Sequence, residues 1–482
     1  MRRLPANEKK KVVVVGGGIS GLSAAYYLSS MSGAATLDLE LAEKSNRFGG
    51  KIETKVRDGF VIEKGPDSFL ARKPALLNLS RELNLEQQLT GTNPKAGKTY
   101  ILHQGRFHEM PKGLVMGIPT RIGPFISTGL LSPAGKMRAA FDLFLPAKKD
   151  GEDETLGAFL RRRLGREVQE NIVEPLLSGI YAGDPSELSL RATFPQFWQI
   201  EQKHRSLILG MAKGASSRTS SGPHPEVPPH VRGSVFVNYR GGLRTVVETL
   251  EHRLREMGVR LTLNKGLRSI QRANDRYELM WEDGSLSDAD AIILALPAFE
   301  YGRIFPDIPS VQAFASMPYV SVANVVLAYH KSDVQLKNDS SGFLVPRKEK
   351  RAITACTLTS IKWLHTAPKD KVLIRCYIGR AGEEQWMEQD DDELVQTATR
   401  ELEQLLGIQA RPLFYEVTRL ARSMPQYTRG HLERVRQMRE DLKQSMPGVF
   451  VTGSAFTGIG LPDCVRQGKE AAEQVAEHLG LK

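Results

Sequence analysis

Four residues near the start of the chain have the types and the spacing to bind a dinucleotide. Gly16, Gly18 and Gly21 fit the pattern G-x-G-x-x-G, and Glu43 follows after a second apolar run. In such a turn the first glycine permits a tight bend, the second lets a pyrophosphate approach the backbone, and the third lets a helix pack closely on a strand. A carboxylate placed like that of Glu43 accepts hydrogen bonds from a ribose. The spacing therefore predicts a dinucleotide-binding turn.

A second glycine-rich stretch near the C-terminus could complete such a site. The residues from Gly453 to Leu461 precede an expected helix over Cys464 to Leu479. A helix N-terminus offers free N–H groups and a positive dipole end to an anion or an electron-rich ring. The stretch from Arg47 to Lys51, which follows the acidic residue, is either part of the same site or a solvated loop.

A parallel sheet with helices has to position these residues. The apolar run Val12–Val15, a helix over Leu22–Leu28 and a strand over Thr36–Ala42 predict a β-α-β unit. Buried strands are also expected at Ala289–Leu296 and Gly448–Gly453. The predicted fold class is α/β, with a Rossmann-like domain assembled from discontinuous segments.

Two further parts complete the expected architecture. Strands such as Val320–Tyr329 and Val372–Ile378 predict a sheet-based substrate domain, and a helical cap domain follows residue 109. Within it, Glu154–Glu174 has the apolar face of a helix, whereas Ser216–Pro229 is typical of a loop. The predicted division is 1–72, 235–300 and 447–482 for the cofactor-binding domain, 73–108, 201–234 and 301–446 for the substrate domain, and 109–200 for the helical domain.

Composition restricts the class of protein. The chain has 482 residues, three cysteines and a net charge of +11, which favours several domains, a reducing compartment and an anionic partner. A basic tract with interleaved aromatics, zinc-ligand spacing and a helix-turn-helix signature are all missing, so we expect no nucleic-acid binding. The basic start Met1–Lys10 has no apolar run typical of a secretory signal, and no apolar stretch is long enough to span a membrane. An anionic small molecule and an anionic membrane surface stay open as partners.

Further motifs carry a more specific resemblance. Gly65–Lys73, Met110–Pro119, Glu174–Gly183 and the C-terminal glycine-rich stretch resemble the coproporphyrinogen III oxidases of Gram-positive bacteria. These enzymes are the soluble branch of the protoporphyrinogen oxidase family, within the FAD-dependent amine-oxidase superfamily, and the similarity runs over nearly the whole chain. The resemblance implies FAD, molecular oxygen as acceptor and a role in haem biosynthesis. The implied reaction is the six-electron oxidation of coproporphyrinogen III to coproporphyrin III, with protoporphyrinogen IX as a further substrate and hydrogen peroxide as by-product.

The resemblance also implies which residues contact FAD. Leu420 departs from the family, because similar proteins often place a tryptophan against the flavin there. No catalytic side chain and no metal site are expected, since flavin N5 carries the chemistry. The implied cofactor contacts are Gly16, Gly17, Gly18, Ile19, Ser20, Gly21, Glu43, Lys44, Arg47, Gly50, Lys51, Lys64, Gly65, Pro66, Asp67, Leu267, Gly453, Ile459, Gly460 and Leu461.

The substrate carries four propionates, so its site calls for basic residues around an apolar slot. Arg72 and Lys73 follow the Gly65–Asp67 motif and are candidates for that role; otherwise they form a solvated helix start. Tyr181 is either part of the slot wall or a core tyrosine.

Two other functions stay open at this point. A flavin amine or polyamine oxidase shares both cofactor motifs, although the positive net charge does not suit a cationic substrate. A tetrapyrrole-binding flavoprotein without catalysis is the second alternative. The expected location is the cytoplasm, with at most a loose peripheral contact with the membrane and a transient contact with ferrochelatase.

Overall fold

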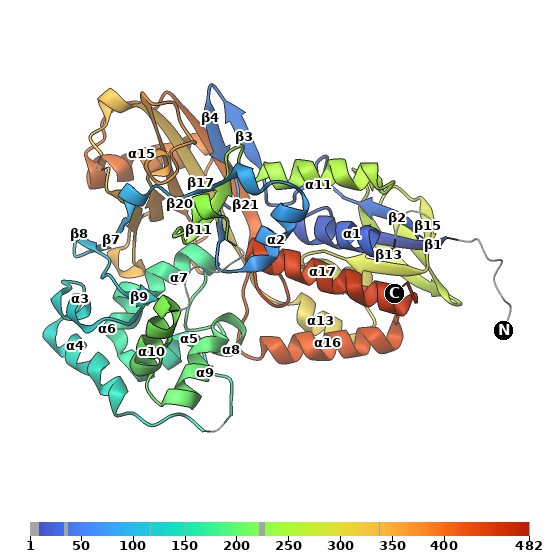
Figure 1. The fold of residues 1–482 in the computed structure, drawn as a ribbon, viewed down its shortest axis with the longest axis horizontal. Helices are drawn as coiled ribbons and strands as arrows, with labels where there is room; N and C mark the ends of the chain where they lie inside the picture. The colour runs from blue at the N-terminus through green and yellow to red at the C-terminus, as the bar shows by residue number, and fades with distance from the viewer. Residues whose placement is uncertain are drawn as a thin grey trace.

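A computed structural model describes residues 9–32, 37–115, 117–149, 151–220, 227–336 and 338–481. Most of the basic N-terminus, Thr36, Met116 and residues 221–226 of the expected loop lie outside the described residues. Figure 1 shows a sheet flanked by helices on the right, a second large sheet at the upper left, and a helical region at the lower left.

The part on the right is built on a parallel sheet with the strand order β12-β2-β1-β16-β22. Val12, Val13 and Val14 in the central strand are fully buried, because helices cover one face of the sheet and a small antiparallel sheet packs against the other. The sheet joins segments from the start, the middle and the end of the chain, which confirms the predicted discontinuous α/β architecture. Its strands are β1 (Lys10–Val15), β2 (Leu37–Ala42), β12 (Arg260–Thr262), β16 (Ala291–Leu294) and β22 (Val449–Val451).

The first helix, α1 (Ile19–Ser32), is buried along most of its length. It packs against α11 (Arg244–Glu256) and α17 (Leu461–His478), so apolar and small residues are needed on all its sides. A Cβ on Gly468 would lie 2.4 Å from the Ser20 carbonyl oxygen, which explains why glycine is required where α17 crosses α1. The helix α17 begins three residues earlier than the sequence predicts, because Pro462 suits a first helical turn.

The second large sheet has the order β21-β17-β20-β19-β18-β7-β8 and is antiparallel except between β18 and β7. The helix α15 (Asp391–Leu406) lies on it and starts with a capping box formed by Asp390 and Glu393. The strands are β7 (Lys98–His103), β8 (Arg106–Glu109), β17 (Tyr319–His330), β18 (Ser340–Leu344), β19 (Ile353–Thr357), β20 (Lys371–Ile378) and β21 (Phe414–Pro425).

Smaller antiparallel sheets accompany the two large ones. Antiparallel strands β3 and β4 pair, β11 lies between β5 and β6, and β14 lies between β13 and β15. The bounds are β3 (Thr54–Arg57), β4 (Phe60–Glu63), β5 (Phe69–Leu70), β6 (Leu89–Gly91), β11 (Phe236–Tyr239), β13 (Leu267–Ala273), β14 (Arg276–Trp281) and β15 (Leu286–Ala289).

The helical region corrects two predictions. The expected helix over Glu154–Glu174 is interrupted, because Gly165 has a φ of +89° and ends α5 before a short helix and a π-helical turn, Gln169–Val173. The expected loop over Ser216–Pro229 is wrong at its start, since α10 continues to Ser220 from buried anchors at Leu207 and Met211. The helices are α3 (Ile122–Ser127), α4 (Pro133–Ala140), α5 (Leu156–Leu164), α6 (Arg166–Val168), α7 (Glu174–Tyr181), α8 (Leu190–Thr193), α9 (Pro195–His204) and α10 (Leu207–Ser220).

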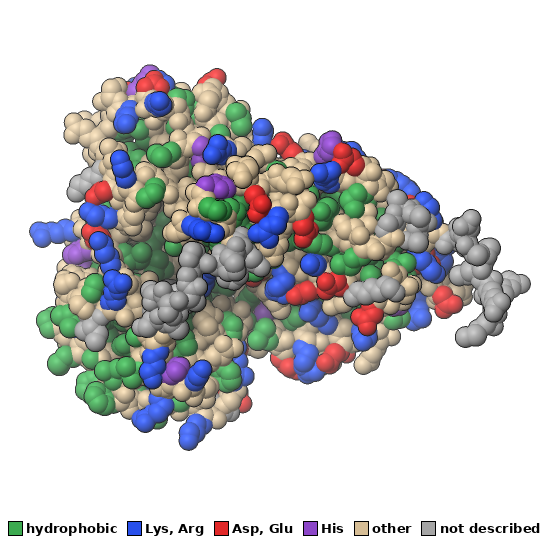
Figure 2. Space-filling view, in the orientation of Figure 1, with side chains coloured by type: hydrophobic (Ala, Val, Ile, Leu, Met, Phe, Trp, Pro, Cys, Tyr) green, Lys and Arg blue, Asp and Glu red, His purple; other side chains and the backbone are tan. Residues whose placement is uncertain are grey.

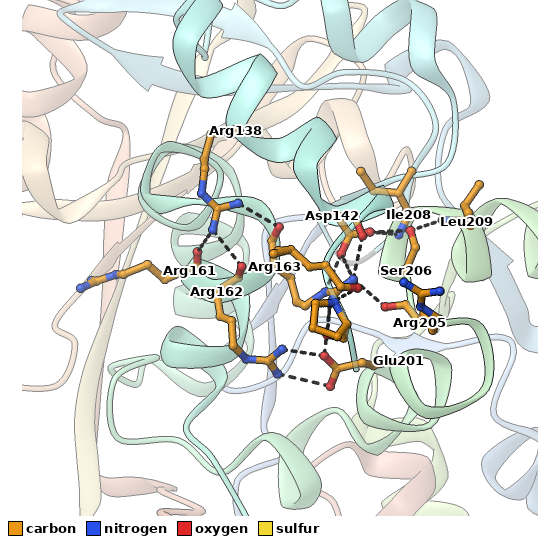
Figure 3. Close-up of polar contacts among 12 residues, drawn as sticks. Arg138, Asp142, Arg161, Arg162, Arg163, Glu201, Arg205, Ser206, Ile208 and Leu209 are labelled. Carbon is orange, nitrogen blue, oxygen red and sulfur yellow. Dashed lines mark hydrogen bonds and ion pairs between the residues drawn. The ribbon is translucent and has the colours of Figure 1, made fainter. Parts of the chain in front are cut away.

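A buried ion network fastens these helices to one another (Figure 3). Arg163 on α5 is fully buried and donates to the Asp142 carboxylate at 2.6 Å. The other Asp142 oxygen accepts from Ser206 Oγ, also at 2.6 Å. Glu201 on α9 is held by Arg162 at 2.6 Å and by Arg163 at 3.4 Å. The network therefore ties α5 to the segment around Asp142, to α9 and to the residues that follow α9.

Candidate flavin site

The turn between β1 and α1 has the geometry of a phosphate-binding turn. Gly16 has a φ of +104°, and a Cβ there would lie 2.5 Å from the Ala295 carbonyl oxygen. A Cβ on Gly21 would lie 1.9 Å from the Gly16 carbonyl oxygen, so strand and helix approach too closely for any side chain. A Cβ on Gly18, in contrast, would meet nothing within 4 Å. Gly18 thus borders open space, as a glycine that lets a pyrophosphate approach must do.

Glu43 lies directly beside this turn, at the carboxyl end of β2. One carboxylate oxygen accepts from the Gly17 N–H at 2.6 Å and the other from the Ser45 N–H at 2.8 Å. Lys44 points elsewhere and pairs with Glu282 at 2.9 Å. The Leu267 carbonyl accepts from Arg303 at 2.7 Å, so that oxygen already has a partner.

The loop over Arg47–Lys51 folds onto the turn through a bridge between Gly18 and Gly49. Arg47 supports the loop itself, since it donates to the Gly50 carbonyl at 2.7 Å and to the Ile52 carbonyl at 2.9 Å. The Lys51 ammonium donates to the Ser423 carbonyl, and burial lowers the pKa of this lysine. The Lys51 side chain is nevertheless exposed to solvent. The Lys51 side chain is therefore crowded by neighbouring protein atoms and still reached by solvent.

The turn Lys64–Asp67 lies next to this loop. A Cβ on Gly65 would lie 1.8 Å from the Lys51 carbonyl oxygen, so glycine is required there. Lys64 pairs with Glu53 at 2.7 Å, and Asp67 accepts from Lys362 at 3.1 Å. Burial alone would raise the pKa of Asp67, but Lys362 and Arg375 hold it well below its usual range.

The C-terminal loop leads into α17 and is hydrogen-bonded to Tyr427. The Tyr427 hydroxyl donates to the Ser454 carbonyl at 2.7 Å and accepts from the Gly458 N–H at 3.0 Å. Its ring stacks on His431, with ring centroids 4.1 Å apart. Burial raises the pKa of Tyr427 and lowers that of His431 to about 4, so both groups are neutral at physiological pH.

The start of α17 already carries a carboxylate. Asp463 lies in the first turn of the helix and pairs with Lys73 at 2.5 Å. This ion pair joins the segment after Asp67 to the C-terminal loop, two parts of the chain that sequence analysis placed at the same cofactor. Gly453 has a φ of +126°, and Ile459, Gly460 and Leu461 are half-buried.

The substrate candidates have different surroundings. Arg72 is exposed and has no hydrogen-bond or ion-pair partner within the described part of the chain, whereas Lys73 is bound to Asp463. Tyr181 is buried and packs edge-on against Phe194 and Tyr427, which places it under the C-terminal loop. Leu420 is half-buried on β21, in register with Val322.

Sequence analysis missed several residues of this site. Asn324 and Arg375 are single polar residues inside apolar strands, and their side chains donate to the Lys64–Asp67 turn. A polar residue in an otherwise buried strand is a signal, because burial without a partner is costly. Tyr427 and Asp463 gave no comparable signal.

Comparison with known proteins agrees with this geometry. Residues 19–476 match the family model described as flavin containing amine oxidoreductase. The chain is 44% identical to coproporphyrinogen III oxidase of Bacillus subtilis (strain 168) over 98% of this chain and 99% of that protein. It is 39% identical to the enzyme of the same name from Staphylococcus aureus, over 98% of this chain and 100% of that protein.

Solved structures share the fold of this chain. A crystal structure from Exiguobacterium sp. 255-15, assigned to the protoporphyrinogen oxidases, superposes with a TM-score of 0.85 at 35% identity and covers 98% of this chain and 99% of that chain. Cyclohexylamine oxidase from Brevibacterium oxydans shares the fold at a TM-score of 0.68 and 19% identity, over 98% of this chain and 100% of that chain. The chain belongs to the flavin-containing amine oxidoreductases, in the branch of the coproporphyrinogen III oxidases.

Proposed function

We propose that this protein oxidises coproporphyrinogen III to coproporphyrin III in haem biosynthesis, with FAD as cofactor, and that it also accepts protoporphyrinogen IX. The observation that carries the proposal is the 44% identity to a coproporphyrinogen III oxidase over almost the full length of both chains. The open space beside Gly18 and the carboxylate of Glu43 next to the same turn support a bound FAD. In this proposal the segments 1–72, 235–300 and 447–482 form the FAD-binding domain.

FAD, when bound, would supply the electron acceptor for the porphyrinogen, with molecular oxygen as the final acceptor and hydrogen peroxide as the by-product. The protein's part is to bind and to orient. Gly16–Gly21 would receive the pyrophosphate, Glu43 the ribose, and the residues of the Lys64–Asp67 turn and the C-terminal loop would border the flavin. We assign no general acid or base, because loss of electrons makes the macrocycle aromatic and supplies much of the driving force.

The propionates of the substrate require cations, and the ion pair at α17 suggests how they are supplied. Lys73 is neutralised by Asp463, so a propionate has to replace or share that partner. Arg72 is exposed and next in sequence, so it can approach a second propionate at no such cost. Tyr181 under the C-terminal loop is the proposed apolar wall.

Anaerobic reduction of the bound flavin tests this function. The purified protein is mixed with coproporphyrinogen III, with protoporphyrinogen IX and with a polyamine, and bleaching of the flavin absorbance is followed. We expect the first to bleach it fastest, with porphyrin and peroxide formed once air is admitted. Bleaching by the polyamine alone would indicate an amine oxidase. Tight binding of porphyrin with no bleaching by either porphyrinogen would indicate a carrier.

We also propose a cytoplasmic protein that touches anionic membranes loosely. Among the described residues no helix is both apolar and long enough to cross a bilayer. Figure 2 shows hydrophobic side chains gathered at the lower left, over α3 and α4. Ile126, Met137, Phe141 and Phe144 are each more than half exposed, and Lys149 is exposed near them in the sequence. Apolar groups with basic neighbours suit an anionic lipid surface.

Co-sedimentation with vesicles tests the contact. We expect binding to vesicles rich in anionic lipid that weakens with salt and is lost in the double variant Met137→Ser/Phe144→Ser. Equal sedimentation of the variant and the unmodified protein would remove this surface from the proposal.

A transient contact with ferrochelatase, which would receive the product, is tested separately by cross-linking the two purified proteins during turnover.

A further inference from the structure

The turn Lys64–Asp67 has its backbone carbonyls held by side chains from outside the turn. Asn324 Nδ2 donates to the Lys64 carbonyl at 2.9 Å. Arg375 donates through Nη2 to the Gly65 carbonyl. Asn238 Nδ2 donates to the Asp67 carbonyl at 3.0 Å. Three of the four carbonyls of the turn therefore have a dedicated side-chain donor.

These donors come from three separate strands. Asn238 is on β11, Asn324 on β17 and Arg375 on β20, and their side chains are 1%, 2% and 3% exposed. Burying an amide or a guanidinium is costly unless it is hydrogen-bonded. A core that only needed to be filled would use apolar side chains at these positions, as it does on either side of Asn324 and Arg375 in the same strands.

Fixing the carbonyls also fixes the N–H groups that follow them. A peptide unit is planar, so an N–H points away from the carbonyl of its own unit. With the Lys64 carbonyl turned toward Asn324, the Gly65 N–H points away from β17. Gly65 is buried, and its N–H has no acceptor among the described residues. A buried donor without an acceptor is uncommon in native proteins and points to a ligand.

Charge adds to the same arrangement. The Asp67 carboxylate accepts from Lys362 at 3.1 Å and from Ser68 Oγ at 2.6 Å. The Asn238 amide also donates to Glu63 at 3.2 Å, so it is itself held in place. Side chains from two different sheets, the large antiparallel sheet and the small sheet that contains β11, thus fix this turn.

We infer that Asn238, Asn324 and Arg375 are positioning residues that set the Lys64–Asp67 turn, and above all the Gly65 N–H, against the flavin. The inference rests on the proposed function, because it takes this turn to be a flavin contact. Through Asn324 and Arg375, the sheet assigned to the substrate also determines the environment of the cofactor. A hydrogen bond to the flavin changes the stability of its oxidised and reduced forms unequally, so the turn tunes the flavin midpoint potential.

The variant Asn324→Ala in the FAD-loaded protein tests this inference. The matched control is Asn171→Ala, since Asn171 is a buried asparagine that donates to the Leu130 carbonyl at 2.6 Å in the helical region. Both variants remove a buried amide that donates to a backbone carbonyl, and the Asn171 amide also accepts from Lys348 Nζ. We expect both to lower the melting temperature by a similar amount.

The flavin readouts separate the two variants. For Asn324→Ala we expect the FAD dissociation constant to rise about tenfold, the flavin midpoint potential to change, and kcat to fall more than KM rises. For Asn171→Ala we expect no change in dissociation constant, spectrum or potential. An Asn324→Ala protein with the affinity, spectrum and potential of the unmodified protein would overturn the inference. If Asn324→Ala does not fold, Asn324→Thr, which suits a strand, is measured in its place with the same expected results.

The two proposals fail in different ways. An unmodified protein whose flavin is not reduced by any porphyrinogen contradicts the proposed function. An unmodified protein that is reduced normally, together with an Asn324→Ala protein that matches Asn171→Ala in every flavin readout, contradicts the positioning role alone.

Discussion

Replacing Arg163 by methionine keeps much of the side-chain volume but removes a charge that protein surrounds completely (Figure 3). The guanidinium donates to the Asp142 carboxylate at 2.6 Å, to the Arg205 carbonyl at 2.6 Å and to the Pro146 carbonyl at 3.0 Å. In Arg163→Met these acceptors lose their donor, and the Asp142 carboxylate, also fully buried, loses its cation.

The loss of stability in Arg163→Met depends on the hydrogen-bond donors that Asp142 and Glu201 retain. Removing one partner of a buried ion pair costs about 3–5 kcal/mol. Asp142 keeps two donors, Ser206 Oγ at 2.6 Å and the Ile208 N–H at 2.9 Å, and Glu201 keeps Arg162. We therefore expect the lower end of that range, about 3 kcal/mol, for Arg163→Met.

The control lies three residues along the chain. Arg166 pairs with Glu170 at 2.6 Å, the same distance as the buried pair, but its side chain is 76% exposed. We expect Arg166→Met to leave the free energy of unfolding unchanged within error, because water and salt screen an exposed pair.

Urea unfolding followed by circular dichroism measures the free energy of unfolding of both variants. Urea is used because it carries no charge and does not screen ion pairs. Removing the stranded carboxylate as well, in Arg163→Met/Asp142→Leu, is expected to regain part of the loss. Equal stability of Arg163→Met and Arg166→Met would refute the reasoning, because burial would then make no difference to the strength of an ion pair here.

Three further predictions concern the site. Tyr427→Phe keeps the stack on His431 but loses the hydrogen bonds to Ser454 and Gly458, so we expect a loss of about 1–2 kcal/mol in stability and weaker FAD binding, checked by thermal unfolding and flavin titration; an unchanged melting temperature would contradict it. Burial raises the pKa of Glu63 from 4.5 to about 7, so the folded state binds its proton more tightly than the unfolded state. Between these pH values the folded protein should lose stability as pH rises, by up to about 3 kcal/mol, relative to a Glu63→Gln variant; parallel stability curves for the two proteins would show that Glu63 titrates normally. Lys73→Glu places a second carboxylate beside Asp463 and is expected to raise KM for coproporphyrinogen about tenfold with FAD content unchanged; steady-state kinetics equal to those of the unmodified enzyme would remove Lys73 from the substrate site.

The parts of the fold that sequence predicts best are those fixed by short-range pattern. The glycines after Val12–Val15 and the acidic residue after the second strand define β1, α1 and β2, because each has a local steric or hydrogen-bonding reason. Gly165, by contrast, looks like any helical glycine in sequence. That it ends α5 depends on its left-handed backbone, which no short-range pattern marks.

The contacts that complete the site are long-range and have no pattern of their own. Lys73 and Asp463 meet across most of the chain, so no spacing rule could pair them. Asn324 and Arg375 are visible in sequence as polar interruptions of apolar strands, but the turn that they hold is not. Position in three dimensions, rather than residue type, gives these residues their role.

The packing of α17 on α1 has a consequence for how the protein is made. The helix α17 comes after the other elements of the described chain, and it packs along α1, which lies near the start of the sequence. Until α17 emerges from the ribosome, the apolar surface of α1 that faces it stays uncovered. A nascent chain therefore exposes this apolar face until α17 has been made, and FAD favours chains that contain α17, since a ligand that binds only the folded state shifts the folding equilibrium toward it.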